Sequence, residues 1–317
     1  MTTRALVLAD RDGSDIEPLA GGVLPALLRV GGKAVIQHCI EDLWEAGIRD
    51  VAVAVPGADR TIERELGDGR RFGLTLRYID VGGLPAPAEA LSAANLPAED
   101  PLVVARGDVL RGRCARLLVS IAHHAAPDIV HGVVGSRPAG IALLSRRTRG
   151  VNRLDWPTVR DGHRSDKASI VELGDVGFTA LDGMSGLFEA CLGAIEGRYR
   201  GLMLDGRERD RPGQWLGPRV SISRSVHLGG LARIGRGAHL HRDVELAGRV
   251  DIGDRCVIDD GAQLIDTAVM PGTYVGRGVR LQNAIAWGPW LYRADLGTCQ
   301  RVDDPLLLSG PGSAEAA

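Results

Sequence analysis

Aspartates follow two apolar segments of this sequence, at positions where an α/β protein holds a ligand. The segment "RALVLA" at 4–9 runs directly into "DRDGSD", which begins with Asp10 and Asp12, and "PLVVA" at 101–105 is followed by "RGD", which ends at Asp108. Parallel sheets bind their ligands beyond the carboxyl ends of the strands. Carboxylates suit a hard cation such as Mg²⁺. A loop that cradles phosphate instead presents glycines and backbone N–H groups and carries no negative charge.

Strand and helix patterns alternate around these acids. The stretch "AVIQHCIEDLWEA" at 34–46 places apolar residues on one helical face and is followed by Gly47, a typical helix C-cap. Apolar runs at 51–55 and 74–80 predict further buried strands, and residues 187–197 predict a helix that closes the domain. Strands that alternate with helices favour a right-handed, mostly parallel α/β sheet.

Composition excludes several classes of protein. The net charge of −2 gives no reason to expect nucleic-acid binding. The five cysteines are scattered without a CxxC pair, which is typical of reduced core thiols in a cytoplasmic protein. No apolar run approaches the roughly 20 residues that a membrane-spanning helix needs, and the N-terminus begins with a predicted strand rather than a signal peptide. We therefore expect a cytoplasmic protein without a membrane span.

The second half of the sequence has a six-residue period. Large apolar residues recur every six positions, and a second, mostly smaller residue follows each of them by four. The first set is Ile222, Leu228, Ile234, Leu240, Leu246, Ile252, Ile258, Leu264 and Met270, and the second is Val226, Ala232, Ala238, Val244, Val250, Cys256, Ala262, Ala268 and Tyr274. A six-residue repeat is the mark of a parallel β-helix in which each coil takes three hexads. Both sets are expected to face the coil interior.

An α/β domain followed by hexapeptide repeats resembles the sugar-nucleotide pyrophosphorylases, such as mannose-1-phosphate guanylyltransferase. The signature of that family reads Leu-x-Leu-Ala-Ala-Gly-x-Gly-Thr-Arg-Leu, then Pro-Leu-Thr, then Pro-Lys-Ala-Leu-Leu-Pro-Val-Gly-Gly-Lys-Pro, and soon a His. The sequence aligns to it without a gap, and the matching residues are Leu6, Leu8, Ala9, Gly13, Pro18, Leu19, Ala26, Leu27, Leu28, Val30, Gly31, Gly32, Lys33, Ile36 and His38. The resemblance implies a Rossmann-like, mostly parallel nucleotidyltransferase sheet followed by a left-handed parallel β-helix.

The resemblance also implies a site. In this family Mg²⁺ and basic side chains gather a triphosphate, and a sugar 1-phosphate attacks the α-phosphorus in line. The implied nucleotide-binding residues are Leu8, Ala9, Asp10, Arg11, Gly13 and Ala86. The segment "VVARGDVL" resembles the metal-binding Gly-Asp segment, so Asp108 is the implied Mg²⁺ ligand. The second ligand is usually an Asp before the last helix, where a loose alignment places Ala180, with Asp182 nearby but out of register.

The basic residues that the family uses are changed here. The first loop Gly of the family is Arg11, its catalytic Arg is Asp15 and its Lys is Pro25. The base-binding Gly-Thr-Ala stretch corresponds to residues 86–88, where Pro87 has no N–H to offer a base. The loss of one transition-state charge contact costs about 10²–10³ in rate, so these replacements predict a catalytically impaired homologue. Such a protein would bind a sugar nucleotide weakly, or regulate or scaffold an active paralogue in surface-polysaccharide synthesis.

Two other functions stay open. One is an active sugar-1-phosphate nucleotidyltransferase that uses Asp108 for Mg²⁺ and Arg11 or Arg29 for phosphates. The other is an acyltransferase on the β-helix.

Three histidines bear on the acyltransferase alternative. His227, His239 or His241 would then serve as the base. We expect instead that these histidines are exposed and have no catalytic role. His227 and His239 are twelve residues apart rather than about eighteen, which argues against a metal site between coils.

The sequence therefore divides into four segments. We expect a nucleotidyltransferase-like domain at 1–200, a linker at 201–219, the β-helix at 220–286 and a capping or interaction tail at 287–317, with a disordered end. The aromatic residues that begin the tail are expected to cap the open end of the β-helix or to pack on another chain. Exposed backbone edges at the ends of a β-helix favour a homo-oligomer.

Overall fold

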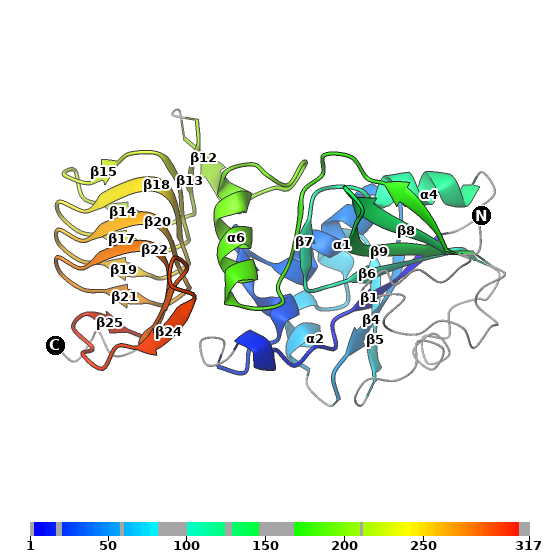
Figure 1. Cartoon of the computed structure of the whole chain (residues 1–317), viewed down its shortest axis with the longest axis horizontal. Coiled ribbons are helices and arrows are strands. Elements are labelled where there is room, and N and C mark those ends of the chain that lie inside the picture. Colours follow the sequence, from blue (N-terminus) through cyan, green and yellow to red (C-terminus); the bar gives the residue numbers. More distant parts are fainter. Residues whose placement is uncertain are drawn as a thin grey trace.

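A computed structural model describes residues 3–16, 21–57, 60–81, 100–123, 129–145, 168–209 and 212–310 of the chain. Figure 1 shows two units side by side, an α/β unit and a stack of short strands, with helix α6 (Met184–Ile195) between them. Among the described helices, none is both long and apolar enough to cross a membrane.

The α/β unit contains alternating strands and helices, as the sequence predicts. Its elements are β1 (Arg4–Leu8), η1 (Ser14–Ile16), η2 (Pro25–Leu27), β2 (Arg29–Val30), β3 (Lys33–Ala34), α1 (Val35–Glu45), β4 (Asp50–Val55), α2 (Thr61–Leu66), η3 (Arg70–Phe72), β5 (Thr75–Asp80), β6 (Leu102–Arg106), β7 (Val109–Arg111), α4 (Ala115–His123), β8 (Ile129–Val134), β9 (Arg137–Leu144), β10 (Ala168–Glu172), β11 (Phe178–Ala180) and α6.

Seven of these strands form one sheet in the order β10-β8-β9-β6-β1-β4-β5. Strand β1 lies between β4 and β6 and is parallel to both. Strand β9 runs antiparallel to its neighbours β6 and β8, so the sheet is mostly parallel. Apolar side chains of the sheet and of α1 share a buried core, which confirms the predicted α/β class.

The second unit consists of short strands and begins before the predicted boundary at 220. Its elements are β12 (Arg207–Glu208), β13 (Gln214–Leu216), β14 (Ser221–Ile222), β15 (His227–Leu228), β16 (Leu231–Ile234), β17 (His239–Leu240), β18 (Glu245–Ile252), β19 (Val257–Ile258), β20 (Gln263–Val269), β21 (Tyr274–Val275), β22 (Arg280–Trp287), β23 (Trp290–Arg293), β24 (Thr298–Arg301) and β25 (Leu308–Ser309). We call residues 214–287 the strand stack. The parallel pairing β13–β16 already belongs to it.

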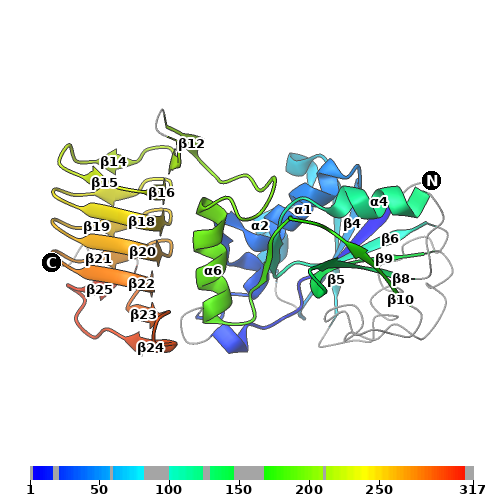
Figure 2. The ribbon, with the colours of Figure 1, turned by 45° about the horizontal axis from the view of Figure 1, so that its top comes forward.

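The strands of the stack pair in parallel with a constant step. Ser221 lies beside His239, and His239 lies beside Val257, so the step is 18 residues, or three hexads. Most apolar residues of the six-residue pattern fill the interior between the two sheets of the stack. Figure 2 shows these strands lying one above another.

The step shortens to 17 residues in the second half of the stack. Ala247 pairs with Ile265, whereas Val250 pairs with Thr267, so one residue fewer connects the two strand segments there. Asp266 occupies this corner with a φ of 44°, a conformation that Asp tolerates better than most residues. Below this corner the register of side chains is displaced by one residue relative to a strict six-residue period.

This shorter step corrects three of the expected inward positions. Met270 and Ala268 leave the stack interior and join a core shared with α6. Val269 takes the inward position below Ile252. Tyr274 is partly exposed, and its hydroxyl donates to Asp259 Oδ2 at 2.8 Å.

The tail closes the stack and joins it to the α/β unit. Strand β25 pairs antiparallel with β21, and its Leu308 is buried in the stack interior. Trp287, Trp290 and Tyr292 pack in the same core as Phe188 of α6. The aromatic residues of the tail therefore contact the chain's own first unit. Residues 311–317, expected to be disordered, lie outside the described residues.

Candidate functional site

The two acid-bearing strand ends meet at the middle of the sheet. Leu8 and Arg106 are register partners at the carboxyl ends of β1 and β6, and the N–H of Gly107 donates to the carbonyl of Leu8 at 2.8 Å. Asp108 follows directly and is 3% exposed. This arrangement places the two acid-bearing segments side by side at one edge of the sheet.

Arg106 holds Asp108 through both carboxylate oxygens. Its Nε donates to Oδ1 at 2.9 Å and its Nη2 donates to Oδ2 at 2.8 Å. The same Nη2 donates to Asp182 Oδ1 at 2.8 Å. Arg106 itself is 8% exposed, so this ion pair is buried. Arg106 has no predicted role from the sequence alone, although the spacing Arg-Gly-Asp after a strand is a signal for such a pair.

Arg11 adds a second guanidinium to the same carboxylates. Its Nη1 contacts Asp108 Oδ2 and donates to Asp182 Oδ1 at 3.1 Å, and its Nη2 donates to Asp15 Oδ2 at 2.5 Å. Two arginines thus face three carboxylates. We call Arg11, Arg106, Asp15, Asp108 and Asp182 the arginine–aspartate cluster.

The cluster keeps Asp108 ionised. Burial alone would raise the pKa of its carboxyl group, but the hydrogen bonds and charge of Arg106, together with Arg11, outweigh burial and hold the pKa below its ordinary value. The negative charge of Asp108 is therefore compensated by the chain itself.

The residues present do not fit the Mg²⁺ ion that the family resemblance implies. Mg²⁺ is bound through carboxylate oxygens, and both oxygens of Asp108 accept hydrogen bonds from positively charged arginines. A cation at Asp108 would lie beside two guanidinium groups. Asp182, which the loose alignment left out of register, reaches Asp108 because the N–H of Leu181 donates to the carbonyl of Asp108 at 3.1 Å. Ala180 itself lies in β11, paired with Val109 of β7.

The loop after β1 is organised by its own side chains. Asp12 is exposed and accepts a hydrogen bond from the N–H of Ser14 at 3.1 Å, which lowers the pKa of Asp12. Gly13 has a φ of 80°, and a side chain added there would approach Pro25 Cδ to 3.0 Å. Pro25, at the position of the family lysine, is buried against this loop.

The other predicted site residues fall in different places. Ala9 is buried, and its N–H donates to the carbonyl of Ala54 at 2.9 Å, while Asp10 is partly buried. Ala86 lies outside the described residues. Arg29 pairs with Glu65 of α2, its Nη2 at 2.8 Å from Oε1.

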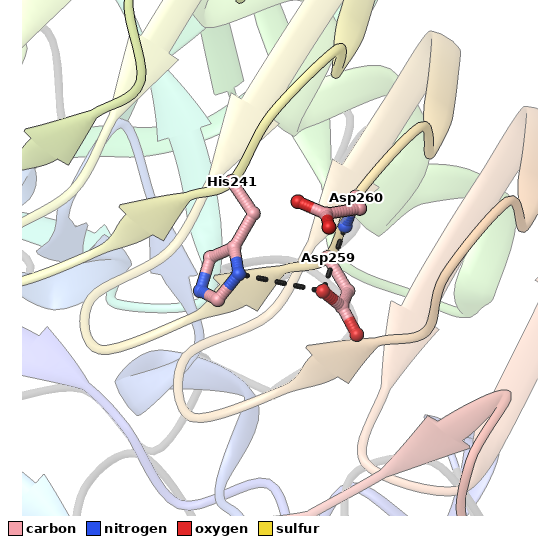
Figure 3. A group of neighbouring side chains, drawn as sticks. All are labelled: His241, Asp259 and Asp260. Carbon is pink, nitrogen blue, oxygen red and sulfur yellow. Dashed lines mark hydrogen bonds and ion pairs between the residues drawn. The ribbon is translucent and has the colours of Figure 1, made fainter.

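The three histidines of the stack singled out from the sequence, His227, His239 and His241, are exposed. Figure 3 shows His241 beside Asp259, with Nδ1 and Oδ1 3.4 Å apart, and Asp260 next to them. This is the one group of three possible metal ligands in the described part of the chain. His241 and Asp259 are separated by the 18-residue step, whereas His227 and His239 are twelve residues apart.

The two acids of that group already have protein partners. Asp260 pairs with Arg242 at 3.0 Å, and Asp259 accepts a hydrogen bond from the Tyr274 hydroxyl. The group is therefore a surface cluster in which both acids already have protein partners.

His38 is a packed core histidine, and it makes stability depend on pH. Its side chain is buried with Nε2 at 3.0 Å from the carbonyl of Val30, and burial lowers its pKa to about 4. The ordinary value is about 6.5, so the unfolded chain binds this proton first. The neutral ring stabilises the folded state above pH 6.5, and we expect up to about 3 kcal/mol of this contribution to be lost as the pH falls towards 4.

Urea unfolding of the natural protein and of a His38→Gln variant at a series of pH values measures this loss. The natural protein should lose stability more steeply than the variant between pH 6.5 and 4. Parallel curves would show that His38 does not titrate as described.

A mostly parallel sheet with acidic residues beyond the carboxyl ends of β1 and β6 defines the class of this protein as an α/β protein with its candidate site at that edge of the sheet. Residues 4–139 match the family model described as "Nucleotidyl transferase". A glucose-1-phosphate thymidylyltransferase from Streptomyces griseus is 24% identical over 92% of this chain and 82% of its own length.

Other relatives align over shorter stretches. A glucose-1-phosphate thymidylyltransferase from Mycolicibacterium smegmatis is 36% identical over 33% of this chain and 37% of its own length. An N-acetylmuramate alpha-1-phosphate uridylyltransferase from Neisseria meningitidis is 32% identical over 34% of this chain and 47% of its own length. For these two relatives the alignment covers less than half of the relative.

A solved structure from Bacillus anthracis, described as a glucose-1-phosphate thymidylyltransferase in complex with sucrose, has the same fold with a TM-score of 0.51 and 18% identity. The alignment covers 60% of this chain and 94% of the chain in that structure. Residues 4–139 of this chain therefore match a nucleotidyl transferase domain, and these similarities support the sugar-nucleotide pyrophosphorylase family.

Proposed function

We propose that this chain is a catalytically impaired member of its family that acts as a regulatory or scaffolding homologue in sugar-nucleotide and surface-polysaccharide synthesis. The observation that carries the proposal is the arginine–aspartate cluster, in which Arg106 and Arg11 take up the oxygens of Asp108. Asp108, the carboxylate that would hold a metal ion for the triphosphate, is neutralised within the chain.

The charges of the loop after β1 support the same proposal of an impaired site. Nucleotidyl transfer depends on positive charge that stabilises the transferring phosphate. Asp15 brings a negative charge to the position of the family arginine, and it accepts a hydrogen bond from Arg11. Pro25 offers no charge and is buried. Arg11 is thus committed to three carboxylates rather than free to meet a phosphate.

The rest of the architecture is kept although the phosphate site is changed. We propose that the strand stack is the left-handed parallel β-helix expected from the hexad pattern, which its parallel 18-residue register supports. A retained sheet and stack suit a protein that acts by binding a partner through its surface. The partner we propose is a second copy of this chain or an active paralogue.

The test is calorimetric titration and turnover with a panel of nucleoside triphosphates and sugar 1-phosphates in the presence of Mg²⁺. The natural protein is expected to show no turnover. A triple variant, Arg11→Gly, Asp15→Arg and Pro25→Lys, restores the residue types of the family loop and should gain nucleotide binding. A variant with Arg11→Gly, Asp12→Arg and Pro25→Lys is the matched control, because it makes the same charge change at a neighbouring position.

Turnover of any substrate pair by the natural protein at a rate normal for an enzyme, about 1–10³ per second, would refute the impaired-site proposal. That result would instead support an active sugar-1-phosphate nucleotidyltransferase in which Arg11 and Arg106 release Asp108 when substrate binds. Equal gains by the triple variant and its control would show that net charge, rather than position, governs binding.

A further inference from the structure

One corner of the strand stack carries three arginines that no carboxylate neutralises. Arg219, Arg236 and Arg255 line an open pocket together with His239 and Asp254. All three arginines are exposed. Within the described ranges of the chain, none of their guanidinium groups forms an ion pair or a hydrogen bond. A net charge of −2 for the whole protein makes such a local excess of positive charge distinctive.

The three arginines come from successive repeats at the same corner. Arg219, Gly237 and Arg255 are each 18 residues apart, and all have a positive φ, of 59°, 62° and 56°. Backbone hydrogen bonds join the corners directly, from Gly237 N to Pro218 O at 3.0 Å and from Arg255 N to Arg236 O at 2.8 Å. Because adjacent strands lie about 4.8 Å apart, Arg219 and Arg255 lie on either side of Gly237 within reach of one small ligand.

Arginine is an unusual residue for this backbone conformation. A positive φ is uncommon outside glycine, and Asn and Asp are the residues most often found there. The other described non-glycine residues of the stack with a positive φ are Asp243, Asp266 and Asn283, which follow that preference. Arg219 and Arg255 do not follow it, and no described side chain pairs with them to explain their presence.

The one acid of the pocket does not cancel this charge. Asp254 Oδ1 accepts a hydrogen bond from the backbone N–H of Arg236 at 2.9 Å, and it lies 3.7 Å from Nη2 of the buried Arg233. Its charge is therefore directed towards the backbone and towards the interior of the stack. A planar guanidinium pairs well with a phosphate group, through charge-assisted hydrogen bonds.

We propose that this corner binds a small ligand through a phosphate or pyrophosphate group. Arg219 and Arg255, from two different repeats, donate hydrogen bonds to this group, and Arg236 adds a third contact. Gly237 leaves the space between them open, since a side chain there would point at the ligand. This site lies on the strand stack and does not depend on the arginine–aspartate cluster or on the function proposed for the α/β unit.

The decisive variant is Gly237→Asp, tested by calorimetric titration of the full chain with inorganic pyrophosphate at low and high salt. Asp tolerates this conformation, as Asp243 shows, and its carboxylate would occupy the space between the two arginines. We expect the natural protein to bind pyrophosphate at low salt, and more weakly at high salt because salt screens exposed charges. Gly237→Asp and Arg255→Ser should each bind at least about tenfold more weakly.

Two matched controls keep the result interpretable. Gly261→Asp adds the same charge at a glycine with a φ of 69° and open space around it, and Arg224→Ser removes an exposed arginine of the stack outside the pocket. Both should bind like the natural protein, and thermal melting of all four variants verifies that the stack stays folded.

Parallel titrations with nucleoside diphosphates identify the source of the phosphate group. Affinity equal to that of pyrophosphate supports a site for the phosphate group alone, and a higher affinity that Gly237→Asp removes supports a nucleotide ligand. The proposal is overturned if neither ligand binds at low salt, if the controls weaken binding as much as the pocket variants, or if only long polyanions bind.

Discussion

Replacing Arg106 by methionine is expected to lower the free energy of unfolding by about 3 kcal/mol. The reason is the carboxylate that the substitution leaves behind. Asp108 is 3% exposed and now accepts two hydrogen bonds from Arg106. Without them it keeps only the contact with Arg11 on one oxygen, and a buried charge without sufficient partners costs several kcal/mol. Methionine fills most of the volume of the arginine stem, so the effect is mainly electrostatic.

Urea unfolding of the variant measures this cost, and the chain offers a matched control. Asp68 and Arg70 are also two residues apart, with Oδ2 and Nε 3.2 Å from each other, but their side chains are 65% and 90% exposed. Arg70→Met should leave the unfolding midpoint nearly unchanged. The double variant Arg106→Met, Asp108→Asn should recover much of the loss, because it removes the uncompensated charge. A loss of the same size in the double variant would mean that Arg106 acts through packing alone.

Replacing Arg233 by methionine is expected to cost about 3–5 kcal/mol, since it breaks a buried ion pair within the strand stack. Arg233 is 2% exposed, and its Nη1 donates to Asp251 Oδ1 at 2.6 Å, one repeat further along the stack. Its Nε donates to the carbonyl of Asp205 in the connection to the α/β unit, at 3.3 Å. Its guanidinium also fills the space beside Gly32, where an added Cβ would lie 2.2 Å from Nη2.

Arg242 and Asp260 form the matched control for this prediction. They too are separated by the 18-residue step and pair at 3.0 Å, but Arg242 is 75% exposed. Arg242→Met should therefore leave the unfolding curve unchanged. Arg233→Met should lower the midpoint and also increase amide hydrogen exchange in the turn between β2 and β3, which Arg233 contacts. Equal behaviour of the two variants would show that neither the stack nor its contact with the α/β unit depends on Arg233.

Much of the architecture follows from local patterns. Buried strands such as 51–55 and the helix at 34–46 are visible because their apolar periodicity reflects the face that packs on the core. The parallel stacking of the second unit follows from the hexads in the same way. The proximity of Asp108 to the loop after β1 also follows, because carboxyl ends of parallel strands share one edge of the sheet.

The content of the site could not be predicted in the same way. The groups that surround the Arg106–Asp108 pair converge from distant segments, since Asp182 is 76 residues from Arg106 along the chain and Arg11 is 97 residues from Asp108. The inward positions of Ala268, Met270 and Tyr274 were wrong for a different reason. The six-residue count fits them, but a corner shorter by one residue changes which side of the strand they occupy.

That shorter corner has a consequence for how relatives of this chain should be compared. A residue lost inside a strand would turn every following side chain to the opposite face, whereas the corner at Asp266 absorbs the loss and keeps Val269 beneath Ile252. Gaps in alignments of homologous stacks should therefore concentrate at this column of corners, which includes Gly248, Asp266 and Asn283. A comparison that assumes one fixed period along the whole stack would align interior residues of one protein with surface residues of another.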